Sequence, residues 1–482
     1  MESIWSKSCT IPERPALCGN LKTEVAVIGA GMAGILTASR LRAAGRDVVV
    51  LEASRIAGGQ TRNTTAKLTA QHGCFAARLI DTLGEEKAKL YAQANSRAIL
   101  DYRALIEEAG IDCDLETQSA FVFGDDEQTL RQEAEAQKRL GLRASFVPSP
   151  ELPGRPNCAV RADGQAQFHP LKLLKAVAEP LTVYEHTPVL RVDDHVLTTD
   201  SGSVEAEKIV FAAHFPFVNF PGFYFARMHQ ERSYVLALEN ASFPEGMWIG
   251  TGKEVWSFRH CGSLLLLGGG GHRTGENSAG GRYGKLREQA GAWFPHSREL
   301  AHWSAQDCMT ADGVPYIGRY AGSKPDWYVA TGFQKWGMST SMVAASLLCD
   351  QICGKENPYA AVFDPGRFDT KAFAGVAAEG AQAVKGLTKR IFRIPKERAA
   401  ELLPGHGGIV TVKGEKLGVY KDPEGALHAV DVRCPHLGCQ VEWNPDERSW
   451  DCPCHGSRFD VDGKLISGPA QTDLDTDAKQ SP

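Results

Sequence analysis

The chain has 482 residues, of which 43% are hydrophobic and 23% are charged, a composition typical of a globular rather than a disordered protein. At about 100–200 residues per domain, this length predicts two to four domains. The formal net charge of -5 argues against a broad positively charged surface that binds nucleic acid or anionic membrane, so no nucleic-acid partner is expected. No apolar run approaches the roughly 18–20 residues of a membrane span. The N-terminus lacks an apolar signal core, which predicts a cytoplasmic protein.

The 13 cysteines are distributed unevenly. Nine are spread over the first 353 residues without paired spacing, whereas four fall between Cys434 and Cys454. A secreted disulfide scaffold would be short and evenly bridged. The cysteines near the C-terminus therefore indicate a metal site.

The globular part begins with a βαβ pattern. Residues 1–20 show no periodicity and predict an irregular N-terminal arm. The apolar residues 25–28 predict a strand, and the spacing over 32–41 fits a helix that stops at Gly45. A second strand over 48–51 completes the unit.

Further elements follow along the chain. The pattern of apolar residues predicts helices over 85–109, 126–140 and 339–353. Strand-like segments recur at 120–123, 189–192, 196–199, 207–213, 233–238, 247–249, 255–258, 263–267 and 328–330. Residues 357–400 are predicted to be a connecting segment with one helix, and short strands with Gly and Pro turns begin at 401.

The βαβ unit contains a dinucleotide-binding pattern. Gly29, Gly31 and Gly34 form GxGxxG between the first strand and the helix, and Glu52 ends the second strand. The three glycines allow a tight turn, a close approach of the pyrophosphate and close packing of helix on sheet. The diphosphate lies at a helix N-terminus, and Glu52 can accept hydrogen bonds from ribose hydroxyls. A purely structural glycine turn is the alternative.

Three more stretches bear on which dinucleotide binds. Residues 58–67 read GGQTRNTTAK, residues 312–318 read DGVPYIG, and residues 330–338 read ATGFQKWGM. There is no second GxGxxG unit for NAD(P)H. With these motifs the chain resembles the D-amino-acid-oxidase-type family of FAD-dependent oxidoreductases over residues 20–360.

The resemblance implies an FAD site assembled from distant segments. The helix that begins near Ser339 would direct its positive end at the flavin. The cofactor-binding residues implied are Gly29, Ala30, Gly31, Met32, Ala33, Gly34, Glu52, Ala53, Gly59, Thr61, Thr64, Thr65, Ala66, Lys67, Val189, Gly313, Gly332, Lys335, Trp336, Gly337, Met338 and Ser339.

Two cysteine and histidine boxes lie near the C-terminus. Residues 434–439 read CPHLGC and residues 452–457 read CPCHGS. Two cysteines and two histidines could form a zinc site, but six metal-capable residues are present where zinc needs four. The pattern resembles a Rieske [2Fe–2S] module, in which imidazoles replace two thiolates on one iron.

The Rieske resemblance implies a role for each residue of the boxes. Cys434 and Cys452 would bind one iron, and His436 and His455 the other. The pair Cys439 and Cys454 would form the disulfide that joins the two loops. Ser457 would donate a hydrogen bond to a cluster sulfur. Phe459 stands where high-potential members carry Tyr, which predicts a lower potential than in respiratory Rieske centres.

The expected fold is α/β plus all-β: a Rossmann-type FAD-binding domain with an interleaved α+β substrate domain, followed by a small β-rich Rieske domain. The predicted FAD-binding lobe comprises 21–75, 150–225 and 305–363, and the substrate lobe comprises 76–149 and 226–304. A linker over 364–400 leads to the Rieske domain at 401–482.

The chain resembles a small group of FAD oxidoreductases that carry a C-terminal Rieske domain, which implies an electron path. FAD would oxidise a C–N bond of an amine, N-methylated compound or amino acid, and electrons would pass to the cluster. A one-electron carrier would then dock near His436 and His455. The alternatives are a reductase that receives electrons through the cluster and an oxygen-using amine oxidase with a structural cluster.

Candidate catalytic residues follow from local features. Four glycines precede His272 and Arg273, which could supply a base and an anion-binding group or could simply end a strand. Tyr234 could help to line an amine pocket, although strand aromatics are more often core residues. Lys335 lies in the turn expected to face the flavin.

Overall fold

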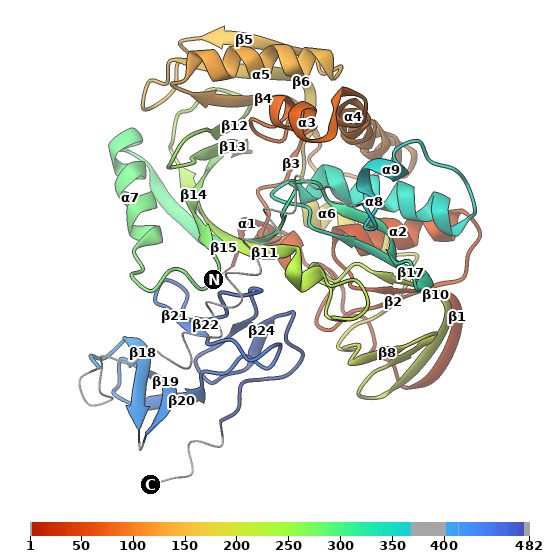
Figure 1. Cartoon of the computed structure of the whole chain (residues 1–482). Helices are drawn as coiled ribbons and strands as arrows, with labels where there is room; N and C mark the ends of the chain where they lie inside the picture. Colours follow the sequence, from red (N-terminus) through yellow and green to blue (C-terminus); the bar gives the residue numbers. More distant parts are fainter. Residues whose placement is uncertain (1, 368–401, 413, 477–482) are drawn as a thin grey trace.

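The computed structural model describes residues 2–367, 402–412 and 414–476 (Figure 1). The described residues form two large mixed sheets with helices and two small C-terminal antiparallel sheets. This confirms the α/β plus all-β fold class expected from the sequence. None of the described helices is long and apolar enough to cross a membrane.

The first sheet is the nucleotide-binding sheet, with strand order β16-β17-β10-β1-β2-β7. Strands β1, β2, β7, β10 and β17 are parallel to one another, and β16 is antiparallel to β17. All four residues of β2 are buried, as expected of a parallel strand that is covered on both faces. The bounds are β1 (Gly19–Ile28), β2 (Val48–Leu51), β7 (Thr182–Tyr184), β8 (Arg191–Asp193), β9 (Val196–Thr198), β10 (Gly202–Phe211), β16 (Tyr316–Ala321) and β17 (Lys324–Thr331).

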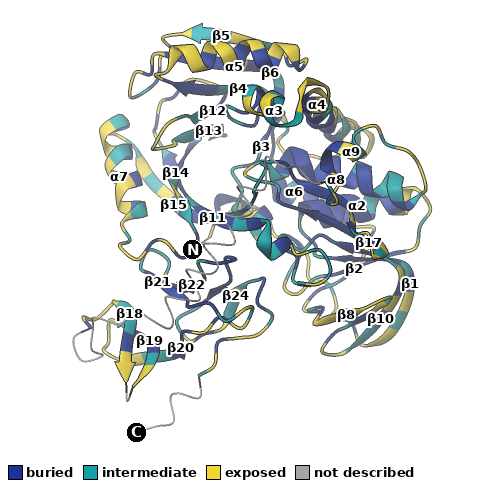
Figure 2. Cartoon of the chain, viewed as in Figure 1, coloured by how far each residue is buried: buried dark blue, intermediate teal, exposed yellow. Residues whose placement is uncertain are grey.

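Two buried helices, α2 (Met32–Ala43) and α8 (Gly337–Ile352), pack against each other and contribute to the main hydrophobic core (Figure 2). The long helix α4 (Glu85–Glu108) packs on α8. The other helices of this part are α3 (Ala76–Leu83), α5 (Glu127–Arg139), α6 (Pro170–Ala178) and α9 (Ala360–Phe363). The packing of α8 on α2 joins two helices that follow the GxGxxG and ATGFQKWGM segments and lie about 300 residues apart in the sequence.

The second large sheet has the order β15-β11-β14-β13-β12-β4-β6-β3, with β5 paired to β6. Helix α7 (Arg282–Trp293) packs on β14 and β11. The bounds are β3 (Lys67–Leu68), β4 (Glu116–Gly124), β5 (Ala144–Pro148), β6 (Cys158–Gln167), β11 (Met228–Glu239), β12 (Met247–Gly250), β13 (Ser257–Cys261), β14 (Leu264–Arg273) and β15 (Arg298–Thr310).

The pairing of β11 with β15 fixes which side chains share a face. Gln230 pairs with Cys308 and Arg232 pairs with Gln306. Because side chains alternate along a strand, Gln230, Arg232 and Gln306 lie on one face, and Glu231 lies on the other. This alternation decides which residues meet the C-terminal part of the chain.

The C-terminal part consists of two small sheets with their own core. One sheet contains β18 (Gly407–Val412), β19 (Glu415–Lys421) and β20 (Leu427–Asp431). The other contains β21 (Glu442–Asn444), β22 (Ser449–Asp451), β23 (Arg458–Phe459) and β24 (Leu465–Ser467). The core includes Trp443, the fully buried Trp450 and the four cysteines of the boxes. In Figure 1, β21, β22 and β24 lie next to β11 and β15, whereas β18, β19 and β20 lie farther from them.

Two expectations need correction. The N-terminal arm is not irregular throughout, because it contains α1 (Ile4–Ser8) and buries Trp5, whose Nε1 donates to Thr64 O at 2.7 Å. The strand predicted over 263–267 is longer than expected, because β14 continues through glycines 268–271 and ends at Arg273. Most of the predicted linker, residues 368–400, lies outside the described residues, and the domain boundaries stay predictions.

Candidate functional site

The loop between β1 and α2 has the shape that a dinucleotide requires. Gly29 has φ +104°, and a Cβ at Gly34 would overlap the carbonyl oxygen of Gly29. Gly31 caps α2 without a side-chain hydrogen bond, so the N-terminus of this helix is open to an anion. Ala30, Met32 and Ala33 complete the loop, and all three are buried.

Glu52 and Thr61 hold this loop in place. The Glu52 carboxylate accepts hydrogen bonds from the backbone N–H of Ala30 at 2.7 Å and of Ser54 at 2.9 Å, and burial raises its pKa. The Thr61 hydroxyl accepts from the N–H of Met32 at 3.0 Å. The structure therefore brings these predicted residues together at the end of β2.

The turn after β17 crosses the edge of β15. Gly332 has φ +72°, and a Cβ there would overlap Thr310. Gln334 adopts the left-handed region at φ +53°, where its N–H donates to Cys308 O at 2.9 Å and its side chain donates to Thr310 Oγ1 at 2.7 Å. These bonds hold the non-glycine residue in a strained conformation, a feature that concentrates at functional sites.

The N-terminal end of α8 begins directly after this turn. The ring of Trp336 stacks on His72, with centroids 4.9 Å apart and planes 7° apart. His72 also bonds to Ser339 Oγ at 3.0 Å and to Tyr91 OH at 2.7 Å, and burial lowers its pKa to about 3. The sequence marks His72 as a conceivable attachment point for the flavin or, more often, a structural histidine, but no spacing rule joins it to Trp336.

Lys67 lies on β3 of the second sheet, and its side chain reaches residues of β12 and β13 in the same sheet. Its Nζ donates to Trp248 O and to Ser257 Oγ, both at 2.6 Å. Burial, with a smaller contribution from Arg259, lowers the pKa of Lys67 to about 7. This amine therefore changes charge near neutral pH, unlike an exposed lysine.

Lys335 faces acidic residues of β11 and β15. Its Nζ lies 3.2 Å from Glu231 and 3.2 Å from Asp307. Burial alone would lower the pKa of Lys335, but the two carboxylates raise it, so the ammonium stays protonated. A hydrogen bond from His229 lowers the pKa of Glu231 to about 2. Lys335 was predictable from the ATGFQKWGM motif, whereas no motif marks the carboxylates of Glu231 and Asp307.

The remaining predicted FAD residues occupy several places. Ala66 is buried at φ +54°, and Thr64 Oγ1 accepts its N–H at 2.9 Å. Thr65 O accepts a bond from Arg259 at 2.8 Å. Ala53 and Gly59 are exposed, and Val189 is buried in the core of the nucleotide-binding sheet. Gly313 packs against Arg78. Gly337 and Met338 are the first two residues of α8.

The four predicted iron ligands converge in the C-terminal part. Cys434 and Cys452 are buried and in hydrogen-bond contact, and the rings of His436 and His455 lie 4.9 Å apart at 89°. The Nδ1 atom of His436 is buried without a hydrogen-bond partner, and burial lowers the pKa of this imidazole to about 4. A buried neutral imidazole nitrogen without a partner, together with two buried thiols, suits a [2Fe–2S] cluster with mixed ligands.

The other predicted residues of the boxes surround these ligands. Cys439 and Cys454 form a disulfide. Ser457 Oγ is in hydrogen-bond contact with Cys434 and accepts the N–H of Ala470 at 2.9 Å. Phe459 is fully buried and supplies no hydroxyl.

The second box docks on β11, β14 and β15 through consecutive carbonyl oxygens. Arg273 donates to Pro453 O at 3.1 Å and to Cys454 O at 3.3 Å. Gln230 Nε2 donates to His455 O at 2.6 Å, and Gln306 Nε2 donates to Gly456 O at 2.8 Å. The ligand His455 is only 2% exposed, with Phe215 and Phe225 against its ring.

A buried ion pair anchors the same interface. Arg232 and Glu447 have side chains 2% and 5% exposed, with Nη2 and Oε1 2.6 Å apart. Glu447 also accepts from Arg458 at 2.8 Å, and Arg458 bonds to the buried Asp451 at 3.0 Å. Removing one partner of such a pair leaves a buried charge, which costs about 3–5 kcal/mol.

The structure places the sequence-predicted catalytic residues Tyr234, His272 and Arg273 at this interface. Tyr234 OH bonds to His272 Nε2 at 3.0 Å, and Asn277 connects Tyr234 to Asn444. Tyr234 and His272 share the face of Arg232, whereas Arg273 pairs with Glu231 near the end of β14. Lys335 meets the face of Glu231. The sequence analysis missed Gln230, Arg232 and Gln306, because no motif marks a strand residue that contacts a part of the chain about 150–225 residues away.

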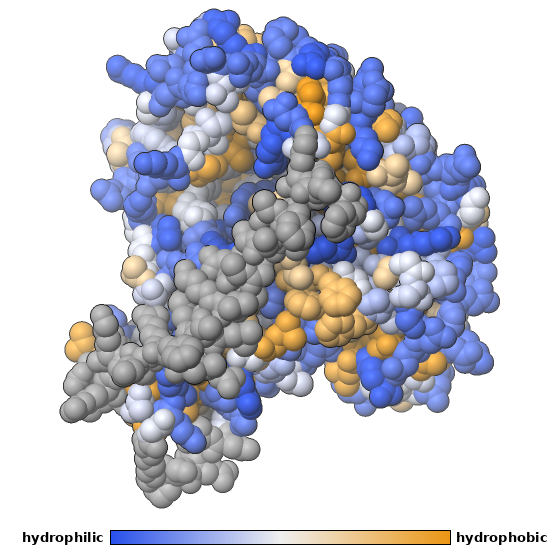
Figure 3. Space-filling model, viewed as in Figure 1, coloured by the Kyte–Doolittle hydropathy of each residue, from blue (hydrophilic) through white to orange (hydrophobic). Residues whose placement is uncertain are grey.

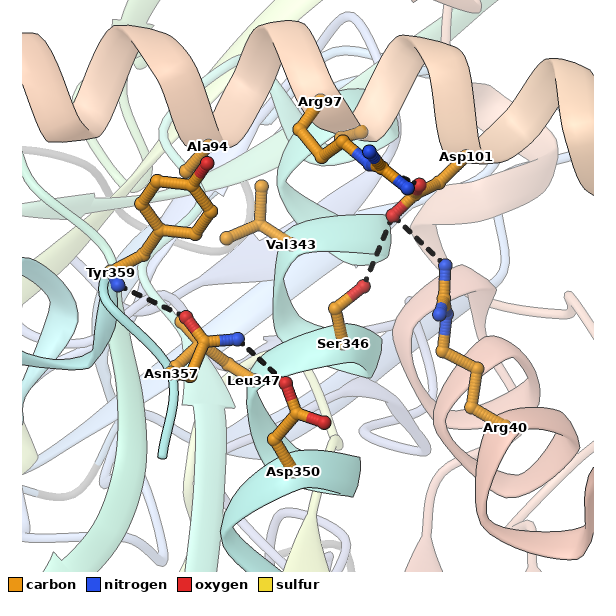
Figure 4. Close-up of a pocket in the computed structure, with 11 residues that line it drawn as sticks. Arg40, Ala94, Arg97, Asp101, Val343, Ser346, Leu347, Asp350, Asn357 and Tyr359 are labelled. Carbon is orange, nitrogen blue, oxygen red and sulfur yellow. Dashed lines mark hydrogen bonds and ion pairs between the residues drawn. The ribbon is translucent and has the colours of Figure 1, made fainter. Parts of the chain in front are cut away.

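A separate cavity of about 210 Å³ lies between α2, α4 and α8 (Figure 4). Asp101 in its wall pairs with Arg40 and Arg97 and accepts a bond from Ser346. The cavity faces the middle and C-terminal turns of α8, away from the turn that opens this helix. Because its aspartates already have partners, we assign no ligand to it.

The chain belongs to the FAD dependent oxidoreductase family, whose match covers residues 24–351. A Rieske [2Fe-2S] domain matches residues 393–477. The protein is therefore an FAD-dependent oxidoreductase that carries a Rieske [2Fe–2S] site.

One relative is similar over almost the whole chain, and two solved structures share the fold of its larger part. The chain is 37% identical over 498 residues, 98% of each chain, to YhfW of Bacillus subtilis (strain 168), whose name describes a Rieske 2Fe-2S iron-sulfur protein. The fold of this chain is similar to that of L-proline dehydrogenase from P. horikoshii, with a TM-score of 0.62 and 17% identity. The match covers 72% of this chain and 98% of that one. Glycine oxidase from Geobacillus kaustophilus also has a similar fold, with a TM-score of 0.60 and 22% identity. The match covers 72% of this chain and 99% of that one.

Replacement of Gly34 by Ala tests the dinucleotide loop. The added methyl group would overlap Gly29 and push α2 from β1, and every 1.4 kcal/mol of lost binding weakens affinity about tenfold. We expect purified G34A to lose most of its FAD, measured by absorbance after unfolding. The control G291A, on α7 with open space around it, should retain FAD. Full FAD occupancy in G34A would contradict the assignment.

Replacement of Cys434 by Ser tests the cluster site. A serine hydroxyl does not ionise like a thiolate at neutral pH, so the cluster should be lost. We expect iron content and the EPR signal of the reduced cluster to disappear. The control C18S removes an exposed free thiol and should leave both unchanged. Retention of the wild-type iron content and EPR signal in C434S would show that the ligand set is wrong.

Proposed function

We propose that the protein oxidises a C–N bond of an amine, N-methylated compound or amino acid and passes the electrons from the flavin to the Rieske cluster. The observation that carries this proposal is the position of Gln306 on the edge strand β15. Its N–H donates to Gln60 Oε1 in the flavin motif at 2.7 Å, and its side chain donates to Gly456 O in the second cluster box. One residue thus contacts both cofactor-binding loops.

The residues present fit the division of chemistry between the two cofactors. When bound, FAD supplies two-electron hydride chemistry and a Rieske cluster supplies one-electron chemistry. The turn at 332–336 orients the N-terminal end of α8 toward the flavin site, which favours negative charge there. The interface excludes water from His455, because Phe215, Phe225 and Gln230 cover this ligand.

The class of substrate rests on the charge around the turn and on related structures. Glu231 and Asp307 surround one lysine, so this wall of the site has a surplus of negative charge that favours a cationic amine. Among proteins with a similar fold, one is named L-proline dehydrogenase and another glycine oxidase. A bound cationic amine would first lose its proton, after which hydride removal from the carbon next to the neutral nitrogen needs no strong base on the protein.

An external one-electron carrier would approach from the side of His436. The inner ligand His455 is covered, whereas His436 is half-buried, bonds to Asn219 Oδ1 at 2.8 Å and precedes the exposed Leu437. Phe220 and Phe223, which are 61% and 52% exposed, follow Asn219. An apolar patch on the visible surface in Figure 3 lies beside the C-terminal part, and such patches often bind partners.

Anaerobic titration with a panel of amines, N-methylated compounds and amino acids tests the proposal. One substrate should bleach the flavin absorbance, after which the EPR signal of the reduced cluster should develop. A reductase would show the reverse, with no amine bleaching the flavin while reduced ferredoxin does. Hydrogen peroxide at the full turnover rate in air, with the cluster unchanged, would identify an oxidase instead.

A further inference from the structure

The backbone of the second cluster box is held by side chains that belong to the flavoprotein sheet. The carbonyl oxygens of four successive residues, 453 to 456, accept bonds from Arg273, Gln230 and Gln306. A Cβ at Gly456 would lie 2.7 Å from the Cβ of Gln230. The box therefore lies directly on β11, and its φ of +84° at Gly456 permits this approach.

The two glutamines also fix each other. Gln306 Nε2 donates to Gln230 Oε1 at 2.6 Å, and Gln306 Oε1 accepts from Arg232 Nη1 at 3.0 Å. These bonds determine the orientation of both amides, so each amide directs one N–H at a carbonyl oxygen of the cluster box. Both side chains are 1% exposed, which makes an unsatisfied carbonyl there costly.

The flavin side connects to the same residues. Gln60 precedes Thr61 in the flavin motif and accepts the backbone N–H of Gln306 at 2.7 Å. The turn residue Gln334 donates to Cys308 O, and Cys308 pairs with Gln230 across the two strands. Both flavin segments are therefore bonded to the short ribbon that carries the two glutamines.

We propose that Gln230 and Gln306 are positioning residues that hold the cluster ligand His455 at a fixed place beside the flavin segments. His455 is the inner ligand, on the side where electrons pass between the two cofactors, and Arg273 supports the box from β14. The effect of the two glutamines on the rate of electron transfer rests on the proposed function. The positioning itself can be tested without turnover.

The test uses the full-length holoprotein with Gln230→Glu and Gln306→Leu. The glutamate keeps the shape and the acceptor for Gln306 but cannot donate to His455 O when ionised. Gln118→Glu on β4, which is half-buried and far along the sheet from this interface, is the matched control. Iron and FAD content confirm that each variant is loaded.

The first measurement is hydrogen–deuterium exchange of the peptide that covers 452–458. Both interface variants should exchange about tenfold faster there, the change that a loss of about 1.4 kcal/mol produces, and Q118E should not. The second measurement is the midpoint potential of the cluster, which should shift in Q230E because a charge next to the ligand backbone alters the local field. Unchanged exchange in both interface variants would overturn the proposal.

The third measurement is the rate of cluster reduction after the flavin is reduced photochemically. It should fall about tenfold or more in both variants, with flavin photoreduction unchanged. Faster exchange with a wild-type electron-transfer rate would overturn the assigned role of the two glutamines. Absence of transfer in the wild type would refute the proposed function, whereas the exchange measurement would still decide whether the glutamines position the box.

Discussion

The alternation of side chains along β11 and β15 is the constraint on which the two-site arrangement depends. Even-numbered residues such as Arg232 and Gln306 contact the Rieske domain, whereas Glu231 and Asp307 face Lys335 of the flavin turn. A shift of the pairing register between β11 and β15 by one residue would move the side chains of one strand to the opposite face of the sheet. The charged side chains would then meet the wrong partners. The same two strands thus contact the turn at 332–336 on one face and the second cysteine–histidine box on the other.

Buried polar and charged side chains stabilise the interface between the second sheet and the Rieske domain and make it specific. The Arg232–Glu447 pair is almost completely desolvated and is bonded further to Gln306 and Arg458. Burial of two charges costs free energy unless the geometry is good, so such a pair tolerates few alternative arrangements. Together with the bonds to the carbonyls of the second box, it favours one docked position of the cluster domain.

Local motifs made much of the fold and of the cofactor sites predictable. The GxGxxG loop with Glu52 depends on short spacings, and so do the four predicted iron ligands. The residues of each set lie together in the structure. The placement of Tyr234, His272 and Arg273 was not predictable, because the face of a strand depends on its partners. Gln230 and Gln306 carry no motif, and their partners lie about 150–225 residues away.

The central claim is that electrons pass between flavin and cluster within one chain. The most direct test is the rate of cluster reduction, after rapid flavin reduction, as a function of protein concentration. Because Gln306 joins the two loops within one molecule, the account predicts a first-order rate constant that is independent of concentration. A rate constant proportional to protein concentration would show transfer between molecules and contradict it.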